Sequence, residues 1–167
     1  MNLILCGMMG AGKTTVGKRL ASILKKEFVD TDELIEKRYG RICDIFEREG
    51  EKRFREMEEE TANILADSDG IVLATGGGFF LSPNNAELLK RDGKIVYLRA
   101  SAETLEKRLR GQGGRPLLRG EESLLSILKR LLSEREKRYE EVADFVVDVD
   151  GKEMETVAFE IIKMVKE

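Results

Sequence analysis

The sequence contains no histidine, and it contains only two cysteines among its 167 residues. Without histidine, the chain can form neither a Ser-His-Asp nor a Cys-His catalytic arrangement, and no zinc site built on imidazole. Any general base must therefore be a carboxylate, a lysine, a tyrosine or a cysteine. Cys6 and Cys43 are too few for a disulfide framework. We interpret them as free thiols of a cytoplasmic protein, packed as small core residues.

Long apolar runs and an excess of one charge are also absent. No apolar stretch approaches the roughly 20 residues that span a bilayer. The N-terminus has no basic region ahead of its apolar residues, so we expect neither a membrane anchor nor a signal peptide. The 29 basic and 32 acidic residues nearly cancel, leaving a net charge of −3. This balance argues against nucleic acid or a membrane surface as the main partner.

Short apolar runs alternate with helical patterns along the whole chain, whose length predicts a single domain, 1–167. We expect strands at 2–6, 27–32, 70–78, 94–100 and 144–150. We expect helices at 12–26, 33–40, 41–67, 84–93, 101–110, 122–143 and 152–167, the third of them broken near Gly50. Most of the strands are nearly all apolar, as when helices cover both faces of a parallel sheet. The pattern therefore predicts a three-layer α/β fold with a five-stranded parallel sheet, which binds ligands at the C-terminal ends of its strands.

The stretch GMMGAGKT, residues 7–14, matches the phosphate-loop pattern G-x-x-x-x-G-K-[ST] and lies between an expected strand and an expected helix. The alternative is a glycine-rich turn with a chance lysine, but the complete pattern in this context favours nucleotide binding. Lys13 would reach the β- and γ-phosphates, and the Thr14 hydroxyl would bind Mg²⁺. The residues assigned to the nucleotide are Gly7, Gly10, Ala11, Gly12, Lys13, Thr14 and Thr15.

Other features separate the classes of phosphate-loop protein. The N-K-x-D motif with which GTPases read the base is absent. The strand expected at 70–78 ends in TGGG, where a motor ATPase would carry aspartate and glutamate. The chain is short, and a glycine-rich loop with arginines comes late in it. We therefore predict a small-molecule kinase, in which the protein mainly positions phosphates and neutralises their charge.

Seven segments in order resemble the shikimate kinase family, and the likeness covers nearly the whole chain. They are GMMGAGKTTVGKRLA, FVDTDELIE, IFEREGEKRFREME, LATGGG, RPLL, EREKRY and VADFVVDVD. The resemblance implies a fold like that of nucleoside monophosphate kinases, with sheet order 2-3-1-4-5. It implies phosphorylation of the 3-hydroxyl of shikimate with ATP and Mg²⁺, in aromatic amino-acid biosynthesis. It also implies a substrate-binding helical region at about 32–60 and a lid at about 111–120, and we expect a monomer.

The resemblance assigns further site residues. Asp32 would bind shikimate hydroxyls and act as the base, and Asp30 would lie near Mg²⁺. Arg55 and Arg135 would hold the shikimate carboxylate, with Glu58 supporting Arg55.

It also assigns backbone and lid residues. Gly76, Gly77 and Gly78 would place their backbone against shikimate. Arg115 would reach from the lid to the phosphates and the substrate. Arg110 would lie beside the nucleotide, with Arg108 as the alternative.

The residues by themselves leave other interpretations open. Asp30 and Asp32 would share one face of an extended segment, but Asp32 could instead cap the helix that follows. Arg55 could belong to a solvated, ion-paired face. Arg135 lies within an apolar stripe, where it needs an anion or an internal glutamate. Residues 76–78 could be a simple glycine-rich turn.

Two other functions remain as alternatives. One is a different small-molecule kinase, for gluconate or a nucleotide, although DTD, TGGG and RPLL together are not expected of a gluconate kinase. The other is a nucleotide-dependent switch without catalysis, against which the missing N-K-x-D motif and the acceptor-like Asp32 argue.

Overall fold

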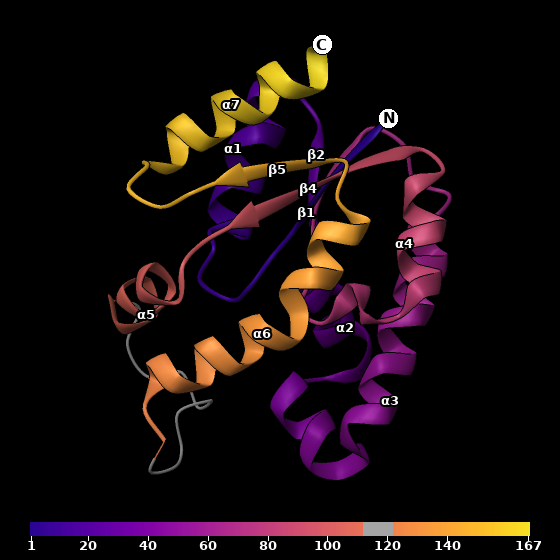
Figure 1. Ribbon diagram of the computed structural model, residues 1–167. Coiled ribbons are helices and arrows are strands. Elements are labelled where there is room, and N and C mark those ends of the chain that lie inside the picture. Colours follow the sequence, from indigo (N-terminus) through magenta and orange to yellow (C-terminus); the bar gives the residue numbers. More distant parts are fainter. Residues whose placement is uncertain (112–121) are drawn as a thin grey trace.

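The computed structural model describes residues 1–111 and 122–167, and it has a parallel five-stranded sheet at its centre (Figure 1). The strands are β1 (Asn2–Cys6), β2 (Glu27–Asp30), β3 (Ile71–Ala74), β4 (Gly93–Arg99) and β5 (Phe145–Asp148). The helices are α1 (Lys13–Leu24), α2 (Thr31–Tyr39), α3 (Ile42–Leu65), α4 (Pro83–Lys90), α5 (Ala102–Gly111), α6 (Leu124–Val142) and α7 (Met154–Lys166), with a 3₁₀ turn, η1 (Phe79–Leu81). The order β2-β3-β1-β4-β5 confirms the predicted topology.

Helices cover both faces of the sheet. α1 and α7 pack together on one face, and α3, α4 and α6 lie on the other (Figure 1). β1, in the middle of the sheet, is buried along its whole length. The three-layer arrangement explains why the central strands are almost entirely apolar.

The strand register sets where the site forms. Asp30 lies opposite Ala74 in the β2–β3 pair, and Ala74 lies opposite Leu5 in the β1–β3 pair. Three segments therefore leave the sheet at one edge: the loop 7–12, the start of α2 and the glycines 76–78. This edge is the C-terminal one, where ligands bind in open parallel sheets.

The strands predicted over 27–32 and 70–78 both end earlier, at Asp30 and Ala74. The side chain of Asp30 accepts hydrogen bonds from the backbone N–H groups of Asp32 (2.9 Å) and Glu33 (3.3 Å), so it caps α2. Asp32 therefore lies in the first helical turn. The prediction that Asp30 and Asp32 share one face of an extended segment was wrong, and the capping residue is Asp30 instead of Asp32.

The break predicted near Gly50 is confirmed, because this residue has a non-helical backbone (φ 82°, ψ 173°) inside α3. A second, small apolar cluster lies around this break and joins α2 to both halves of α3. It consists of Ile35, Ile45, Phe54 and Met57. The segment 32–60 thus has packing of its own, and its role in receiving the substrate stays a prediction.

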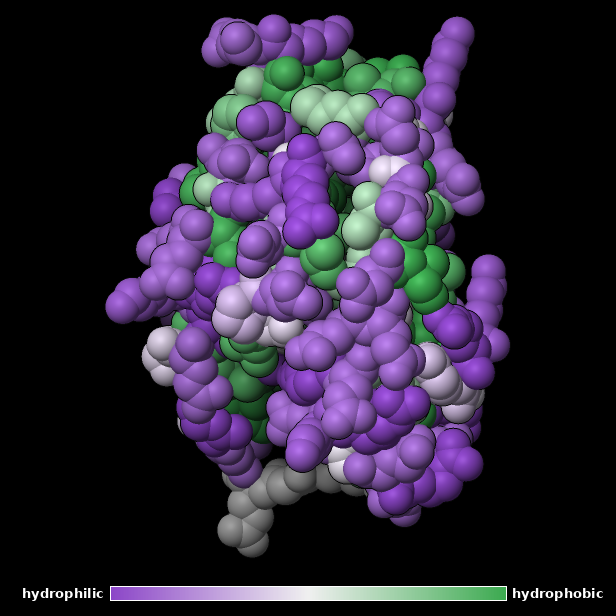
Figure 2. Space-filling view, turned by 90° about the vertical axis from the view of Figure 1, so that its right-hand side faces the viewer, coloured by the Kyte–Doolittle hydropathy of each residue, from purple (hydrophilic) through white to green (hydrophobic). Residues whose placement is uncertain are grey.

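The surface is mainly hydrophilic on the face shown in Figure 2. Large exposed apolar side chains in the described part of the chain are scattered over the N-terminus, α3, η1 and α7; they are Met1, Phe46, Ile64, Leu81 and Phe159. None of the described helices combines the length and apolar character needed to cross a membrane. The expectation of a monomer stays a prediction.

Candidate functional site

The phosphate loop connects β1 to α1, and its glycines leave its backbone accessible to a ligand. Gly7, Gly10 and Gly12 have φ values of 141°, 83° and 98°, which residues with a side chain rarely adopt. Gly12 is also the N-cap of α1, and no side chain caps this helix end. The first N–H groups of α1 are thus left for an anion, as a phosphate-binding loop requires.

Lys13 folds over its own loop. Its Nζ donates to the backbone carbonyl of Gly7 and to that of Met8, at 3.3 Å in the second case. Burial lowers the pKa of Lys13 to about 8, while the charge of Asp32 opposes this shift. A bound phosphate would replace these carbonyls as the partner of the ammonium group and favour its charged form.

A cavity of about 360 Å³ lies between the phosphate loop and the glycines that follow β3. It unites most of the residues predicted for the site. Those that line it are Gly10, Gly12, Lys13, Thr14, Thr15, Asp30, Asp32, Gly76, Gly77 and Arg135. Gly7 and Ala11 are buried in the phosphate loop. Arg115 and the lid from residue 112 to 120 lie outside the described residues.

Thr14 and Asp30, the residues predicted for the metal, are in contact. The Thr14 hydroxyl donates to Asp30 Oδ2 at 3.3 Å, while Oδ1 of the same carboxylate caps α2. Hydroxyl and carboxylate oxygens are ligands that Mg²⁺ prefers. The described residues contain no cluster of three or more His, Cys, Asp or Glu that could hold a metal ion. A Mg²⁺ ion at this pair would therefore complete its shell with phosphate oxygens and water.

Asp32 is a half-buried carboxylate at the cavity wall. Burial raises its pKa, the negative charge of Asp30 adds to this effect, and Lys13 opposes it. A carboxylate whose pKa is raised is a stronger base than an ordinary aspartate once it is ionised. This environment suits the predicted role in deprotonating an acceptor hydroxyl.

The three consecutive glycines face three different charged side chains. A Cβ on Gly76 would lie 2.6 Å from Asp32 Oδ1, and one on Gly77 would lie 3.0 Å from Arg135 Nη1. A Cβ on Gly78 would collide with the guanidinium group of Arg55.

Sequence reasoning expected these glycines to make room for the substrate. The structure shows that they make room first for the three side chains predicted to bind it, which converge on one short segment of backbone. A glycine-rich turn without a role in the site does not account for this convergence.

Arg55 is held by two carboxylates of its own helix. Its guanidinium donates to Glu58 Oε1 at 2.6 Å and to Glu51 Oε1 at 3.2 Å. Glu58 has only 2% of its side chain exposed, and burial raises its pKa to about 7. Glu58 therefore contacts Arg55, as predicted. Glu51 forms the i,i+4 ion pair that was expected if Arg55 belonged to a solvated face.

Arg135 reaches the cavity from α6. Within residues 1–111 and 122–167, no salt bridge joins Arg135 to a carboxylate. Arg135 therefore forms no direct ion pair with an internal glutamate among these residues, although its charge partly offsets the burial that raises the pKa of Glu58. A guanidinium that lines the open cavity beside Gly77 is suited to an anionic ligand.

Arg108 and Arg110 differ sharply in position. Arg108 Nη1 donates to the backbone carbonyls of Ala11 (2.9 Å) and Gly10 (3.4 Å) in the phosphate loop. Arg110 has 68% of its side chain exposed and lies 3.6 Å from Glu106. The structure thus places the alternative, Arg108, against the phosphate loop. The contact of Arg110 with a nucleotide stays a prediction that no described contact supports.

This difference predicts unequal effects of two matched substitutions in α5. Arg108→Ala removes the donor that holds two phosphate-loop carbonyls, so we expect about a tenfold loss of ADP affinity. Arg110→Ala removes an exposed group, and we expect a change of less than about twofold. Isothermal titration calorimetry with ADP checks both. A larger loss in Arg110→Ala would restore the original assignment.

Sequence analysis assigned no site function to Tyr139, which the structure places close to the site. The Tyr139 hydroxyl donates to the Gly77 carbonyl at 2.5 Å and lies 3.8 Å from the sulfur of Met8 in the phosphate loop. The available signal was its position one helical turn after Arg135.

Phe79 and Phe80 are buried in the core. Cys6 is buried too, but Cys43 is exposed, so the prediction that both cysteines pack as small core residues is wrong for Cys43.

Comparisons with known proteins agree with this geometry. The family model "Shikimate kinase" matches residues 9–166. A curated shikimate kinase from Hahella chejuensis is 45% identical over 166 residues, covering 99% of this chain and 86% of the relative. Among solved structures, "Shikimate kinase from Acinetobacter baumannii in complex with shikimate" has a TM-score of 0.91 and 40% identity, covering 99% of this chain and 92% of the other.

A shikimate kinase from Bacteroides thetaiotaomicron also superimposes with a TM-score of 0.91, at 31% identity, covering 100% of this chain and 99% of the other. Fold, phosphate loop and nearly full-length similarity thus lead to one conclusion. The chain belongs to the shikimate kinase family.

Proposed function

We propose that this protein transfers the γ-phosphoryl group of ATP to the 3-hydroxyl of shikimate, giving ADP and shikimate 3-phosphate for aromatic amino-acid biosynthesis. The observation that carries the proposal is that one cavity joins the phosphate loop to Asp32 and Arg135. A phosphoryl donor and an acidic, hydroxylated acceptor can meet there. The family membership and the shikimate complex of the Acinetobacter baumannii relative support the choice of acceptor.

On the nucleotide side, the phosphate loop would bind the phosphates through its backbone N–H groups and the N-terminus of α1. Lys13 would turn from the carbonyls of Gly7 and Met8 to the β- and γ-phosphates. Thr14 and Asp30 would hold Mg²⁺ together with phosphate oxygens. When bound, this ion would neutralise charge on the phosphates.

On the acceptor side, Asp32 would accept the proton of the 3-hydroxyl as the hydroxyl oxygen bonds to the γ-phosphorus. The bond from this phosphorus to the β,γ-bridging oxygen breaks, and ADP leaves. The raised pKa of Asp32 favours its acceptance of that proton. Asp32 also contacts the segment of Gly76, so the base and the acceptor would be positioned by the same backbone.

Arg135 and Arg55 would hold the shikimate carboxylate. Both guanidinium groups lie against the glycine segment, Arg135 at Gly77 and Arg55 at Gly78. Guanidinium can bind a carboxylate through two parallel hydrogen bonds, which fixes its orientation as well as its position. The acceptor ring would then lie against the backbone of residues 76–78.

Two arginines and the state of the protein in the cell complete the proposal. Arg115 would reach the phosphates from the lid, and Arg108, the alternative to Arg110, would support the nucleotide site through the phosphate loop. We also propose a monomer in the cytoplasm, where the free thiols Cys6 and Cys43 would stay reduced.

An ADP-release assay with a panel of acceptors tests the proposed function. Shikimate should accelerate ADP release, whereas gluconate, AMP and buffer alone should not. Acceleration by gluconate or AMP instead would favour the other small-molecule kinases. Nucleotide binding without acceleration by any acceptor would favour a non-catalytic switch.

Arg135 and Arg55 together form what we call the carboxylate clamp. The substitution Arg135→Lys should severely weaken its grip on the shikimate carboxylate. A lysine keeps the charge but cannot form the two parallel hydrogen bonds. We expect kcat/KM for shikimate to fall by about 30-fold or more, as when a partner of a buried charged pair is lost. ADP affinity should stay nearly unchanged.

A shikimate analogue with a neutral amide in place of the carboxylate separates binding from structure. Wild type should discriminate strongly against the amide, and Arg135→Lys should discriminate much less. Equal discrimination by both proteins, with a lower melting temperature for the variant, would contradict the clamp.

A further inference from the structure

We propose that Tyr139 is a positioning residue that joins the phosphate loop to the acceptor-binding glycine segment and holds Arg135 in place. This inference rests on the proposed function of the cavity. It assigns a role to a buried hydroxyl that takes no part in the chemical step described above.

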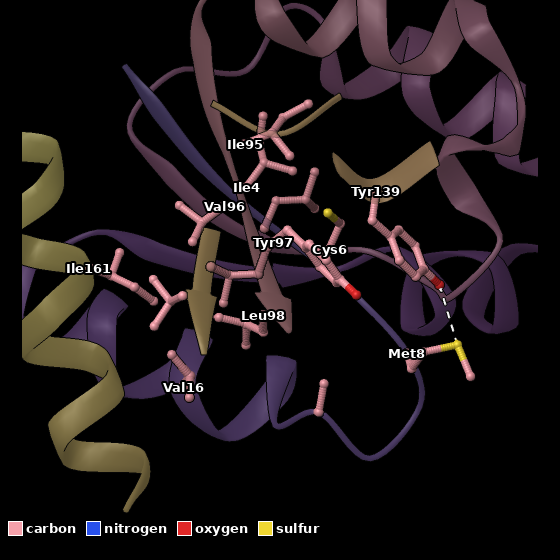
Figure 3. Packing of buried hydrophobic residues seen from close by; sticks show 14 of the residues in the cluster. Ile4, Cys6, Met8, Val16, Ile95, Val96, Tyr97, Leu98, Tyr139 and Ile161 are labelled. Atoms are coloured by element: carbon pink, nitrogen blue, oxygen red, sulfur yellow. Dashed lines mark hydrogen bonds between the residues drawn. The ribbon is translucent and has the colours of Figure 1, made fainter. Parts of the chain in front are cut away.

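Tyr139 lies where three parts of the site meet. It is 2% exposed, on α6, one turn after Arg135. Its hydroxyl lies 2.5 Å from the Gly77 carbonyl oxygen. It also lies 3.8 Å from the Met8 sulfur (Figure 3). A hydroxyl has one proton, so the short contact identifies the Gly77 carbonyl as the acceptor and leaves the sulfur as a weaker neighbour.

Gly77 is the point at which these parts converge. Atoms near the position of its missing Cβ are Arg135 Nη1 at 3.0 Å, the Tyr139 hydroxyl at 3.8 Å and the Gly7 carbonyl oxygen at 3.9 Å. One backbone residue thus lies beside the carboxylate clamp, the tyrosine and the first glycine of the phosphate loop. A shift of Gly77 would move the acceptor relative to the phosphates, and transfer is sensitive to such misplacement.

The electrostatics agree with this placement. Burial raises the pKa of the Tyr139 hydroxyl to about 12, and Arg135 opposes this shift. The hydroxyl therefore stays protonated through the neutral range and remains a donor to the Gly77 carbonyl.

A second buried tyrosine provides a matched control. Tyr97 packs against Tyr139 with ring centroids 5.0 Å apart (Figure 3). Its hydroxyl is buried without a hydrogen-bond partner among the described residues. Tyr139→Phe and Tyr97→Phe each remove one buried oxygen from neighbouring rings, but only the first leaves the Gly77 carbonyl without its donor.

Steady-state kinetics of the two variants test the proposal. We expect Tyr139→Phe to raise KM for shikimate by about tenfold, with kcat lowered less and ADP affinity changed by less than about twofold. Tyr97→Phe should match wild type in all three. Circular dichroism should show both variants folded. Equal KM values for Tyr139→Phe and wild type would overturn the proposal, as would equal losses in both variants.

A double-mutant cycle with Arg135→Lys tests whether Tyr139 acts through Arg135. The effect of Tyr139→Phe on kcat/KM should shrink to about threefold or less in the Arg135→Lys background, because the clamp is already lost. Fully additive effects would show that Tyr139 does not position Arg135.

An inactive wild type would count against the proposed function and not by itself against this inference. NMR of the free protein would then decide, since Tyr139→Phe should shift the Gly77 amide and the Arg135 side-chain resonances more than Tyr97→Phe does. Equal shifts would overturn the role of Tyr139.

Discussion

Asp32→Asn is expected to lower kcat for shikimate phosphorylation by about 10²- to 10⁴-fold, the usual contribution of general-base assistance. The substitution keeps the size of the side chain and removes the basic oxygen. ADP affinity should change much less than kcat, because Asp32 faces Gly76, although the loss of its charge also lowers the pKa of Lys13. The measurement is kcat with saturating ATP and shikimate.

Glu33→Gln provides the control, since it removes one negative charge from the same first turn of α2 at an exposed position. It should leave kcat unchanged.

The melting temperature of Asp32→Asn separates an effect on catalysis from an effect on folding. Folding raises the pKa of Asp32, so its ionised form is disfavoured in the native state at neutral pH. Asp32→Asn should therefore melt no lower than wild type, and normal kcat in this variant would refute its role as the base.

The acid limb of the pH profile gives a second check. Asp32 must be ionised to accept a proton, so kcat/KM should fall as pH decreases through its pKa. Because this pKa is raised, the fall should begin at a higher pH than for an ordinary aspartate. Glu33→Gln should keep this limb, whereas the residual activity of Asp32→Asn should lack it.

Lys13→Met should lower kcat by about 10²- to 10³-fold, comparable to the loss of one preorganised group that stabilises transition-state charge. Methionine fills a similar space without the ammonium group. Lys18→Met, at an exposed position of the same helix, is the control and should retain full activity. Near-normal kcat in a folded Lys13→Met protein would contradict phosphate neutralisation by Lys13.

The pH dependence of nucleotide binding should also depend on Lys13. The pKa of Lys13 in the free protein is about 8, so the ammonium group loses its proton as pH rises through this value. ADP affinity should decrease over the same range in wild type and in Lys18→Met. Calorimetric titrations of Lys13→Met between pH 7 and pH 9 should show a much flatter dependence.

The sequence was sufficient for the architecture and for most of the cavity lining. Strand–helix alternation predicted the parallel sheet, and the family resemblance supplied its order. The phosphate loop was recognisable because its glycines, Lys13 and Thr14 are adjacent in sequence. Local hydrogen bonding was harder to predict. Asp30 and Asp32 are both good N-caps, and only the folded backbone shows that Asp30 is the cap.

Contacts between distant segments could not be predicted. Nothing in the string TGGG indicates that its glycines would face Asp32, Arg135 and Arg55, which come from three different helices. The choice between Arg108 and Arg110 had an overlooked signal. Arg108 follows the buried Leu105 by three residues, so it lies on the inner face of α5, whereas Arg110 points outward.

The most direct test of the central claim is the structure of the reaction product. Wild-type protein would be incubated with ATP, Mg²⁺ and shikimate, and the product analysed by proton-coupled ³¹P NMR. We expect one new phosphate monoester whose phosphorus couples to the proton on carbon 3 of shikimate, with one ADP formed per ester. ADP accompanied only by inorganic phosphate, or an ester on another hydroxyl, would contradict the account.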